Sequence, residues 1–165
     1  MATTAKPLQA RIVTVGFNAS STRFDEPTGE RPVLMGTVEV DVVDRFLAAV
    51  RAGSMSGADD LWKERTVLDA TVPNWRFRCV GARAVSAEYA TWFADPGCFE
   101  ALRRWPTAQG AVVEYTLTWS QRGVPRAGHH VHLLTIEHDR IVTDTVMCGG
   151  RWPASLLAEM EEAGG

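Results

Sequence analysis

The sequence predicts an α+β domain in which helices gather on one face of an antiparallel sheet. Two patterns support this fold class: apolar residues recur at helical spacing from Val40 onward, and residues 99–148 follow a period of two. Helices followed by a run of strands are typical of the α+β class. The chain has 165 residues, of which 45% are hydrophobic, so it is long and apolar enough for one domain with a substantial core.

Residues 1–38 differ in composition from the rest of the chain. A short β-like run at 11–17 precedes a stretch rich in serine, threonine, proline and glycine that continues to Gly36. We interpret residues 1–38 as an N-terminal extension, part strand and part loop, and residues 39–165 as the single folded domain.

About three helices are predicted after this extension. The first ends at Gly53 and has one apolar stripe, formed by Val40, Val43, Leu47 and Val50. Ser56, with an acidic residue three positions later, predicts a second, short helix that runs to about Glu64. Ser86 can cap a third helix that ends before Pro96.

Strands are predicted by short β-type segments bounded by turn residues. Residues 67–72 form a strand that Pro73 closes, and residues 76–80 form a short β segment. Four further segments with a period of two cover residues 99–105, 111–121, 129–137 and 140–148. Pro153 then opens a short C-terminal helix with Leu156, Leu157 and Met160 on one side.

Composition also excludes several classes of partner. The net charge of −3 argues against a nucleic-acid surface. No run approaches the roughly 18–20 apolar residues of a membrane span, and the N-terminus lacks the apolar core of a secretory signal. The three cysteines, Cys79, Cys98 and Cys148, lack the paired spacing of a zinc or redox site. We therefore expect a cytoplasmic protein with no metal and no cofactor.

Three of the four histidines lie on one predicted strand, at His129, His130 and His132. Side chains alternate between the two faces of a strand, so His130 and His132 share a face. The turn at His138–Asp139 contains no glycine, which argues against a two-residue turn, because such a turn needs positive φ at both positions. A three-residue loop requires positive φ only at Asp139.

This three-residue loop predicts that His132 directly faces Asp144 across the hairpin. The two side chains are then close enough to hydrogen-bond. An aspartate that orients a histidine is a common way to make a general base. We therefore predict a catalytic dyad of His132 and Asp144 in a pocket, with His130 deeper or beside it. A structural polar bridge, or histidines on a dimer face, are the alternatives. A metal site lacks a convincing third ligand.

From about Val40 to Trp152, the order of elements and the segments LDATVPNW, RGVPRAGHHVH and IEHDRIV resemble the nuclear transport factor two-like superfamily, in particular its SnoaL-like polyketide cyclase and ketosteroid isomerase branch. The resemblance implies a curved sheet wrapped by helices into a cone, with one deep apolar pocket and pairing of two copies through their sheets. Members range from isomerases, cyclases, dehydratases and epoxide hydrolases to non-catalytic binders, so the fold does not settle the function.

The catalytic residues of the family transfer only in part. The general-base aspartate of the isomerases corresponds to Asn74, which cannot take a proton. The Arg-x-Asp pair and the last-strand aspartate of limonene epoxide hydrolases correspond to Thr116-Leu117-Thr118 and to about Val146, so that triad is absent. The oxyanion-binding aspartate of the isomerases corresponds to the strand position of His132.

Six tryptophans against two tyrosines predict either a thick core or an aromatic-lined cavity. Cys148 is notable for its position before two glycines. We expect the substrate-binding residues to be Asn74, Trp75, Trp92, Tyr115, Trp119, His130 and Cys148.

Two functions follow from these residues. The first is a cofactor-independent isomerase, cyclase or dehydratase that acts on a lipophilic substrate bearing a carbonyl or hydroxyl group. The second is a non-catalytic module that binds an apolar ligand or assembles as a dimer.

Overall fold

The computed structural model describes residues 36–164, which form three α-helices and a curved, open sheet of seven strands. The helices are α1 (Gly36–Ala52), α2 (Ala82–Trp92) and α3 (Ser155–Gly164). The strands are β1 (Trp62–Val72), β2 (Trp75–Val80), β3 (Gly97–Thr107), β4 (Gly110–Gln121), β5 (Val124–Glu137), β6 (Arg140–Cys148) and β7 (Trp152–Pro153). The predicted α+β class is confirmed, whereas the predicted N-terminal extension falls, up to residue 35, outside the described residues.

The strands follow the order β2-β1-β6-β5-β4-β3, and β7 pairs with β5. Every pair is antiparallel except β1 and β6, which run parallel. The expectation of an antiparallel sheet is therefore wrong for this one pair. The chain between β1 and β6 contains α2 and four strands rather than a hairpin, so their connection does not require antiparallel pairing.

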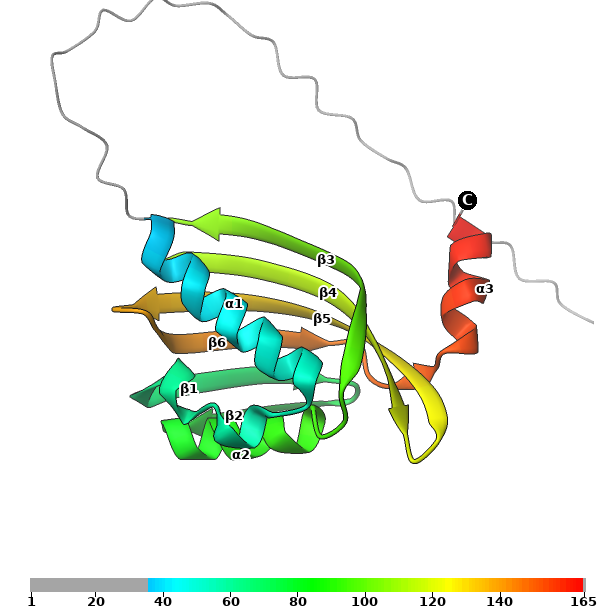
Figure 1. Cartoon of the computed structure of the whole chain (residues 1–165), viewed down its shortest axis with the longest axis horizontal. Helices are drawn as coiled ribbons and strands as arrows, with labels where there is room; N and C mark the ends of the chain where they lie inside the picture. Colours follow the sequence, from blue (N-terminus) through cyan, green and yellow to red (C-terminus); the bar gives the residue numbers. More distant parts are fainter. Residues whose placement is uncertain (1–35, 165) are drawn as a thin grey trace, which may run out of the picture. The chain divides into compact units, whose positions relative to one another are not determined.

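Helices α1 and α2 pack against the same face of the sheet (Figure 1). The ring of Phe46 on α1 lies 6.0 Å from that of Tyr89 on α2 and 5.1 Å from that of His132 on β5. Trp62, at the start of β1, stacks on Tyr89 at 5.5 Å. The core therefore lies between these two helices and the face of the sheet on which His132 lies.

The predicted helix at 56–64 is not formed. Two short 3₁₀ turns, Met55–Gly57 and Asp59–Leu61, lead directly into β1, which begins at Trp62. Met55 and Trp62 are almost fully buried. Burial of these large apolar side chains outweighs the capping signal of Ser56, because a helix this short is marginal without tertiary support.

Ser86 lies inside α2 rather than at its start, so the capping prediction is wrong. The helix begins directly after Gly81, whose φ is 104°. The buried Ser86 hydroxyl instead donates a hydrogen bond to the carbonyl oxygen of Met55 at 3.0 Å. The residue thus fastens α2 to the 3₁₀ turn that precedes β1.

The β5–β6 turn differs from the predicted three-residue loop. Glu137 pairs with Arg140, and both intervening residues have positive φ, 50° at His138 and 58° at Asp139. Arg45 of α1 holds this turn: one of its nitrogens donates to the Asp139 carboxylate at 2.8 Å and to the Asp139 carbonyl oxygen at 3.1 Å. These contacts stabilise a two-residue turn that otherwise favours glycine.

A β-bulge at Val142 determines which face Asp144 occupies. A two-residue turn alone would oppose His132 to Thr145 and place Asp144 on the other face, since a shift of one residue reverses every side chain. The register instead changes between Thr135 and Ile136, so that Val142 is the extra residue and His132 pairs with Val146. His132 and Asp144 therefore share a face, as predicted, but as diagonal rather than directly opposed neighbours.

Candidate functional site

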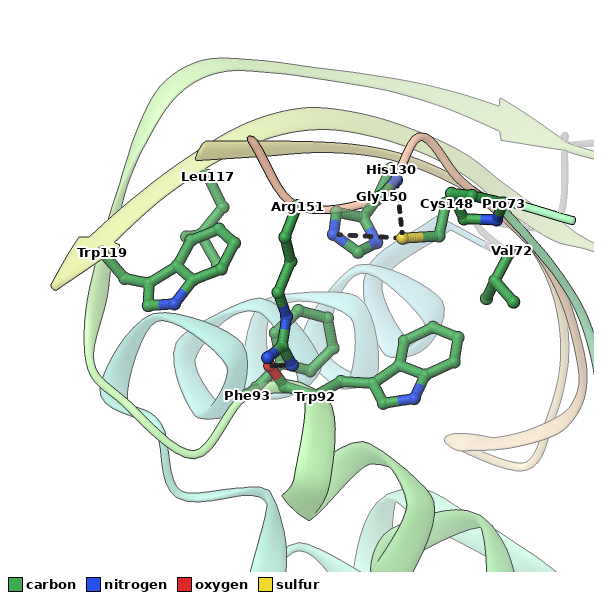
Figure 2. Close-up of a pocket in the computed structure, with 10 residues that line it drawn as sticks. All are labelled: Val72, Pro73, Trp92, Phe93, Leu117, Trp119, His130, Cys148, Gly150 and Arg151. Carbon is green, nitrogen blue, oxygen red and sulfur yellow. Dashed lines mark hydrogen bonds between the residues drawn. The ribbon is translucent and has the colours of Figure 1, made fainter. Parts of the chain in front are cut away.

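A cavity of about 190 Å³ lies where the end of α2 meets β4, β5 and β6 (Figure 2). Its walls are mostly apolar, and its side-chain polar groups come mainly from His130, Cys148 and Arg151. The residues that line the cavity are Val72, Pro73, Trp92, Phe93, Leu117, Trp119, His130, Cys148, Gly150 and Arg151. Small-molecule sites commonly combine an apolar wall with a few polar groups in this way.

His130 is the titratable side chain best placed to meet a molecule in this cavity. It is 5% exposed, and its ring stacks on Tyr115 at 5.2 Å and packs against Phe93 at 5.5 Å. Nδ1 is buried with no hydrogen-bond partner in the described residues, whereas Nε2 lies 4.0 Å from Sγ of Cys148, which also lines the cavity. Nε2 is therefore the ring nitrogen that we expect to face a ligand.

Burial lowers the pKa of His130 from its ordinary 6.5 to about 3, and the neighbouring His132, His129 and Arg151 add to the effect. A protonated imidazole would have to give up water without gaining an acceptor or a carboxylate partner. The His130 ring is therefore neutral at neutral pH.

Cys148 stands beside His130 as a protonated thiol. Burial raises its pKa, although the backbone N–H of Gly150 and the charge of Arg151 act in the opposite direction. The Gly150 N–H donates to Sγ at 3.3 Å. Gly150 adopts a φ of 90°, and a Cβ there would lie 2.7 Å from the Pro73 ring, so the loop after β6 requires glycine at this position.

A second set of polar side chains lies behind His130 and is sealed from solvent. His132, Asp144, Tyr89 and Tyr115 are each 0% exposed. Nδ1 of His132 lies 3.0 Å from Oδ2 of Asp144, and Nε2 of His132 lies 3.0 Å from the Tyr115 hydroxyl. The Tyr89 hydroxyl donates to Oδ2 of Asp144 at 2.5 Å. We call these four side chains the buried network.

Donors and acceptors in the buried network balance. Burial, followed by the field of Asp144, raises the pKa of both Tyr89 and Tyr115, so both phenols keep their protons. Tyr115 can donate to Nε2 of His132, Nδ1–H of His132 can donate to Asp144, and Tyr89 donates to the same carboxylate. This closed set holds His132 firmly and leaves neither of its nitrogens free for a ligand.

The predicted site residues separate into three groups. His130, Cys148, Trp92 and Trp119 line the cavity, as expected. His132, Asp144 and Tyr115 come together, but they lie behind the cavity wall. His130, predicted to lie deeper than His132 or beside it, lies beside it and is the nearer of the two to the cavity. Asn74 and Trp75 lie at the β1–β2 turn, exposed and outside the lining, and Trp75 is 69% exposed.

Two important residues were not identified as site residues from the sequence. Tyr89 belongs to the buried stripe of α2, with Val85 and Ser86, and a phenol on such a stripe signals a polar partner across the core. Arg151 follows a glycine pair, and nothing in its sequence context indicates that its side chain borders a cavity. Only the fold of the loop after β6 places it there.

The low pKa of His130 predicts how stability changes with pH. The folded protein keeps this imidazole neutral to about pH 3, whereas the unfolded chain binds a proton near 6.5, so the free energy of unfolding rises with pH across this window. Well inside the window the change is about 1.4 kcal/mol per pH unit. We expect urea unfolding at about pH 7 and about pH 5 to show this loss on acidification. The loss should shrink in His130→Gln, and an equal loss in that variant would contradict the assignment.

No group of three or more histidine, cysteine, aspartate or glutamate side chains that could hold a metal ion occurs within residues 42–164. No helix in the same range is long and apolar enough to cross a membrane.

Solved structures with the same fold are numerous. A nuclear transport factor 2-like (NTF2-like) protein from Anabaena variabilis superposes with a TM-score of 0.59 and 14% identity over 68% of this chain and 87% of that one. An LEH-like epoxide hydrolase from M. tuberculosis superposes with a TM-score of 0.55 and 15% identity over 68% of this chain and 83% of that one. A steroid delta-isomerase from Pseudomonas aeruginosa superposes with a TM-score of 0.50 and 21% identity over 77% of this chain and 88% of that one.

At these identities the comparisons show the fold alone. No protein-family model matches the sequence, and no curated protein matches it either. The residues of the cavity must therefore carry any argument about function.

Proposed function

We propose that this chain, which has the NTF2-like fold, is a cofactor-independent enzyme of the isomerase, cyclase or dehydratase type that acts on a compact apolar substrate bearing a carbonyl or hydroxyl group. One observation carries the proposal: a neutral imidazole, His130, lines an apolar cavity, with its Nε2 4.0 Å from Sγ of Cys148, another lining residue. Enzymes with this fold include a steroid delta-isomerase and an LEH-like epoxide hydrolase, which supports acid–base chemistry as the class of reaction.

In this proposal His130 accepts a proton from the substrate carbon next to the carbonyl group. The C–H bond breaks, an N–H bond forms at Nε2, and the electron pair moves to the carbonyl oxygen as an enolate. The protonated ring then returns the proton to another carbon, which completes an isomerisation. Because the pKa of His130 is low, the imidazole is a weak base and its protonated form a strong acid, so removal of the substrate proton is the slower step and its return the faster one. The neutral thiol of Cys148 is close enough to donate a weak hydrogen bond to the oxygen.

The buried network has a positioning role in the same proposal. The Tyr115 ring packs against both His130 and His132, with ring centroids 5.2 Å and 5.4 Å away. Because Tyr115 is held by His132, and His132 by Asp144, the ring that supports His130 has one fixed orientation. We therefore assign His132 and Asp144 to positioning rather than to contact with substrate.

The test is exchange of the methyl protons of acetophenone in heavy water, followed by proton NMR. Acetophenone is a compact ketone, and exchange requires only the first proton transfer. We expect the protein to accelerate exchange above the buffer rate, and Val72→Phe, which fills the cavity, to remove the acceleration. Exchange that is not accelerated for acetophenone or for other compact ketones would contradict the proposal.

A non-catalytic binding module is the second candidate, and it is favoured by the closed hydrogen bonding of the buried network. Because His132 and Asp144 satisfy each other, they stabilise the core whether or not chemistry occurs. A module of this kind would bind acetophenone in the cavity without accelerating its exchange. The exchange rate at saturating ligand therefore distinguishes the two functions.

Pairing of two copies through the sheet is part of the proposal. On the face of the sheet away from the helices, Trp105, Val112 and Leu133 form a row across β3, β4 and β5, and Leu133 is 43% exposed. Exposed apolar rows of this kind commonly mark interfaces. We expect a dimer by analytical ultracentrifugation, which Leu133→Glu dissociates. Val80→Glu, on the exposed edge strand β2, should leave the dimer intact, and a monomeric wild-type protein would contradict the proposal.

The cysteines support a cytoplasmic location as a further part of the proposal. Cys79, Cys98 and Cys148 are all free thiols. Free thiols persist in reducing compartments. The cytoplasm is the simplest compartment of this kind.

A further inference from the structure

We propose that the substrate of this cavity also carries a carboxylate or a similar small anionic group, which Arg151 binds at the cavity mouth. The inference rests on the proposed function, because it concerns the ligand of the same site. Arg151 is the one ionisable side chain of the lining that is charged at neutral pH, since His130 and Cys148 are neutral there. It is also exposed, so a molecule that enters can meet it.

The contacts of the Arg151 guanidinium leave most of its donors available. Nη2 lies 3.4 Å from the carbonyl oxygen of Thr91 and 3.5 Å from that of Trp92, at the end of α2. Both distances are long for an N–H···O hydrogen bond. Arg151 forms no ion pair with a carboxylate of residues 42–164. A guanidinium has five N–H donors in a planar arrangement that matches a carboxylate.

Contacts with the end of α2 and with the Trp119 ring fix the position of the Arg151 guanidinium. Figure 2 shows the Arg151 side chain running from the loop after β6 toward Trp92 and Phe93. Its Cζ lies 5.9 Å from the centroid of the Trp119 ring, and the partial negative charge at the end of α2 also favours a cation there. Capping of α2 alone accounts for the side chain's direction. It does not account for a cation whose remaining donors border an apolar cavity.

The size of the cavity restricts the rest of the ligand. A cavity of about 150 Å³ accommodates benzene, and this one has a volume of about 190 Å³. The apolar part of the ligand is therefore about one ring, packed between Phe93 and Leu117 in the cavity wall. A ring-sized body with an anionic head at Arg151 describes a small cyclic carboxylate rather than a steroid or a fused polyketide.

The experiment compares benzoate with benzamide, which has nearly the same shape and no charge, by isothermal titration calorimetry on the full chain. We expect benzoate to bind about tenfold more tightly, because it adds a charged hydrogen-bonded pair. Arg151→Gln should remove this preference while leaving benzamide affinity within about twofold. Arg83→Gln, an exposed arginine on α2 outside the cavity, makes the same change in net charge and should keep the preference.

Equal affinity for the two compounds in the wild type, or a preference that persists in Arg151→Gln, would overturn the inference and leave the proposed function standing. A preference lost equally in Arg83→Gln would also overturn it, because long-range charge would then be the cause. If neither compound binds the wild type, or Val72→Phe binds both as tightly as the wild type does, the cavity is not the binding site. The proposed function then fails together with the inference.

Discussion

His130→Gln is expected to slow the exchange of acetophenone protons at least about 100-fold, because general acid–base catalysis typically contributes 10²–10⁴-fold. A glutamine amide can hydrogen-bond to the substrate oxygen but cannot carry a proton between carbons. The variant therefore separates proton transfer from simple binding, and its acetophenone affinity should stay near that of the wild type. The measurement is the exchange rate by proton NMR at saturating ketone.

His129→Gln is the matched control, since it changes the adjacent histidine on the other face of β5. His129 contacts Thr116 and Glu114 and does not line the cavity. We expect its exchange rate to stay within about twofold of the wild type, because it makes no contribution to acid–base catalysis. Full activity in His130→Gln, or an equal loss in both variants, would show that His130 does not move the proton.

Asp144→Ala is expected to lower the free energy of unfolding by about 2–6 kcal/mol, because it leaves two buried donors unsatisfied at about 1–3 kcal/mol each. The change leaves the Tyr89 hydroxyl and Nδ1–H of His132 without their acceptor in a site that excludes water. Urea unfolding monitored by tryptophan fluorescence measures the loss.

A matched control sharpens this result. Asp69→Ala removes a carboxylate that binds Arg76 at the surface of β1 and β2, and it should cost far less. An Asp144→Ala loss no larger than that of Asp69→Ala would contradict the assigned buried network.

The fold was predictable where one periodicity dominates. The stripe of α1 and the alternation in β4 and β6 required no tertiary information. Prediction failed where packing overrode local signals, as at the 3₁₀ turns after Met55 and at Ser86. It also failed at β5, which begins at Val124 rather than at the predicted residue 129, because the turn before it consists of Arg122 and Gly123 alone.

Of the candidate site, the sequence predicted only which side chains share a face of the sheet. Alternation along β5 and β6 predicted that His130, His132 and Asp144 share a face. The turn is one residue shorter than predicted, but the bulge at Val142 adds one residue to β6, so the two errors cancel and the predicted face is correct. The sequence did not predict which of these side chains lines the cavity and which lies behind its wall, because that depends on how Trp92 and Phe93 pack over the sheet. Arg151 reaches the cavity through the loop after β6, and no periodicity describes a loop of this kind.

The most direct test of the central claim is a nitrogen-15 histidine NMR spectrum recorded with and without acetophenone. The claim is that His130, not His132, meets the ligand. His130 lines the cavity, whereas both nitrogens of His132 are occupied within the buried network. The predicted result is a saturable change in the Nε2 resonance of His130 while the resonances of His132 stay in place. A change confined to His132, with His130 unaffected, would contradict the account.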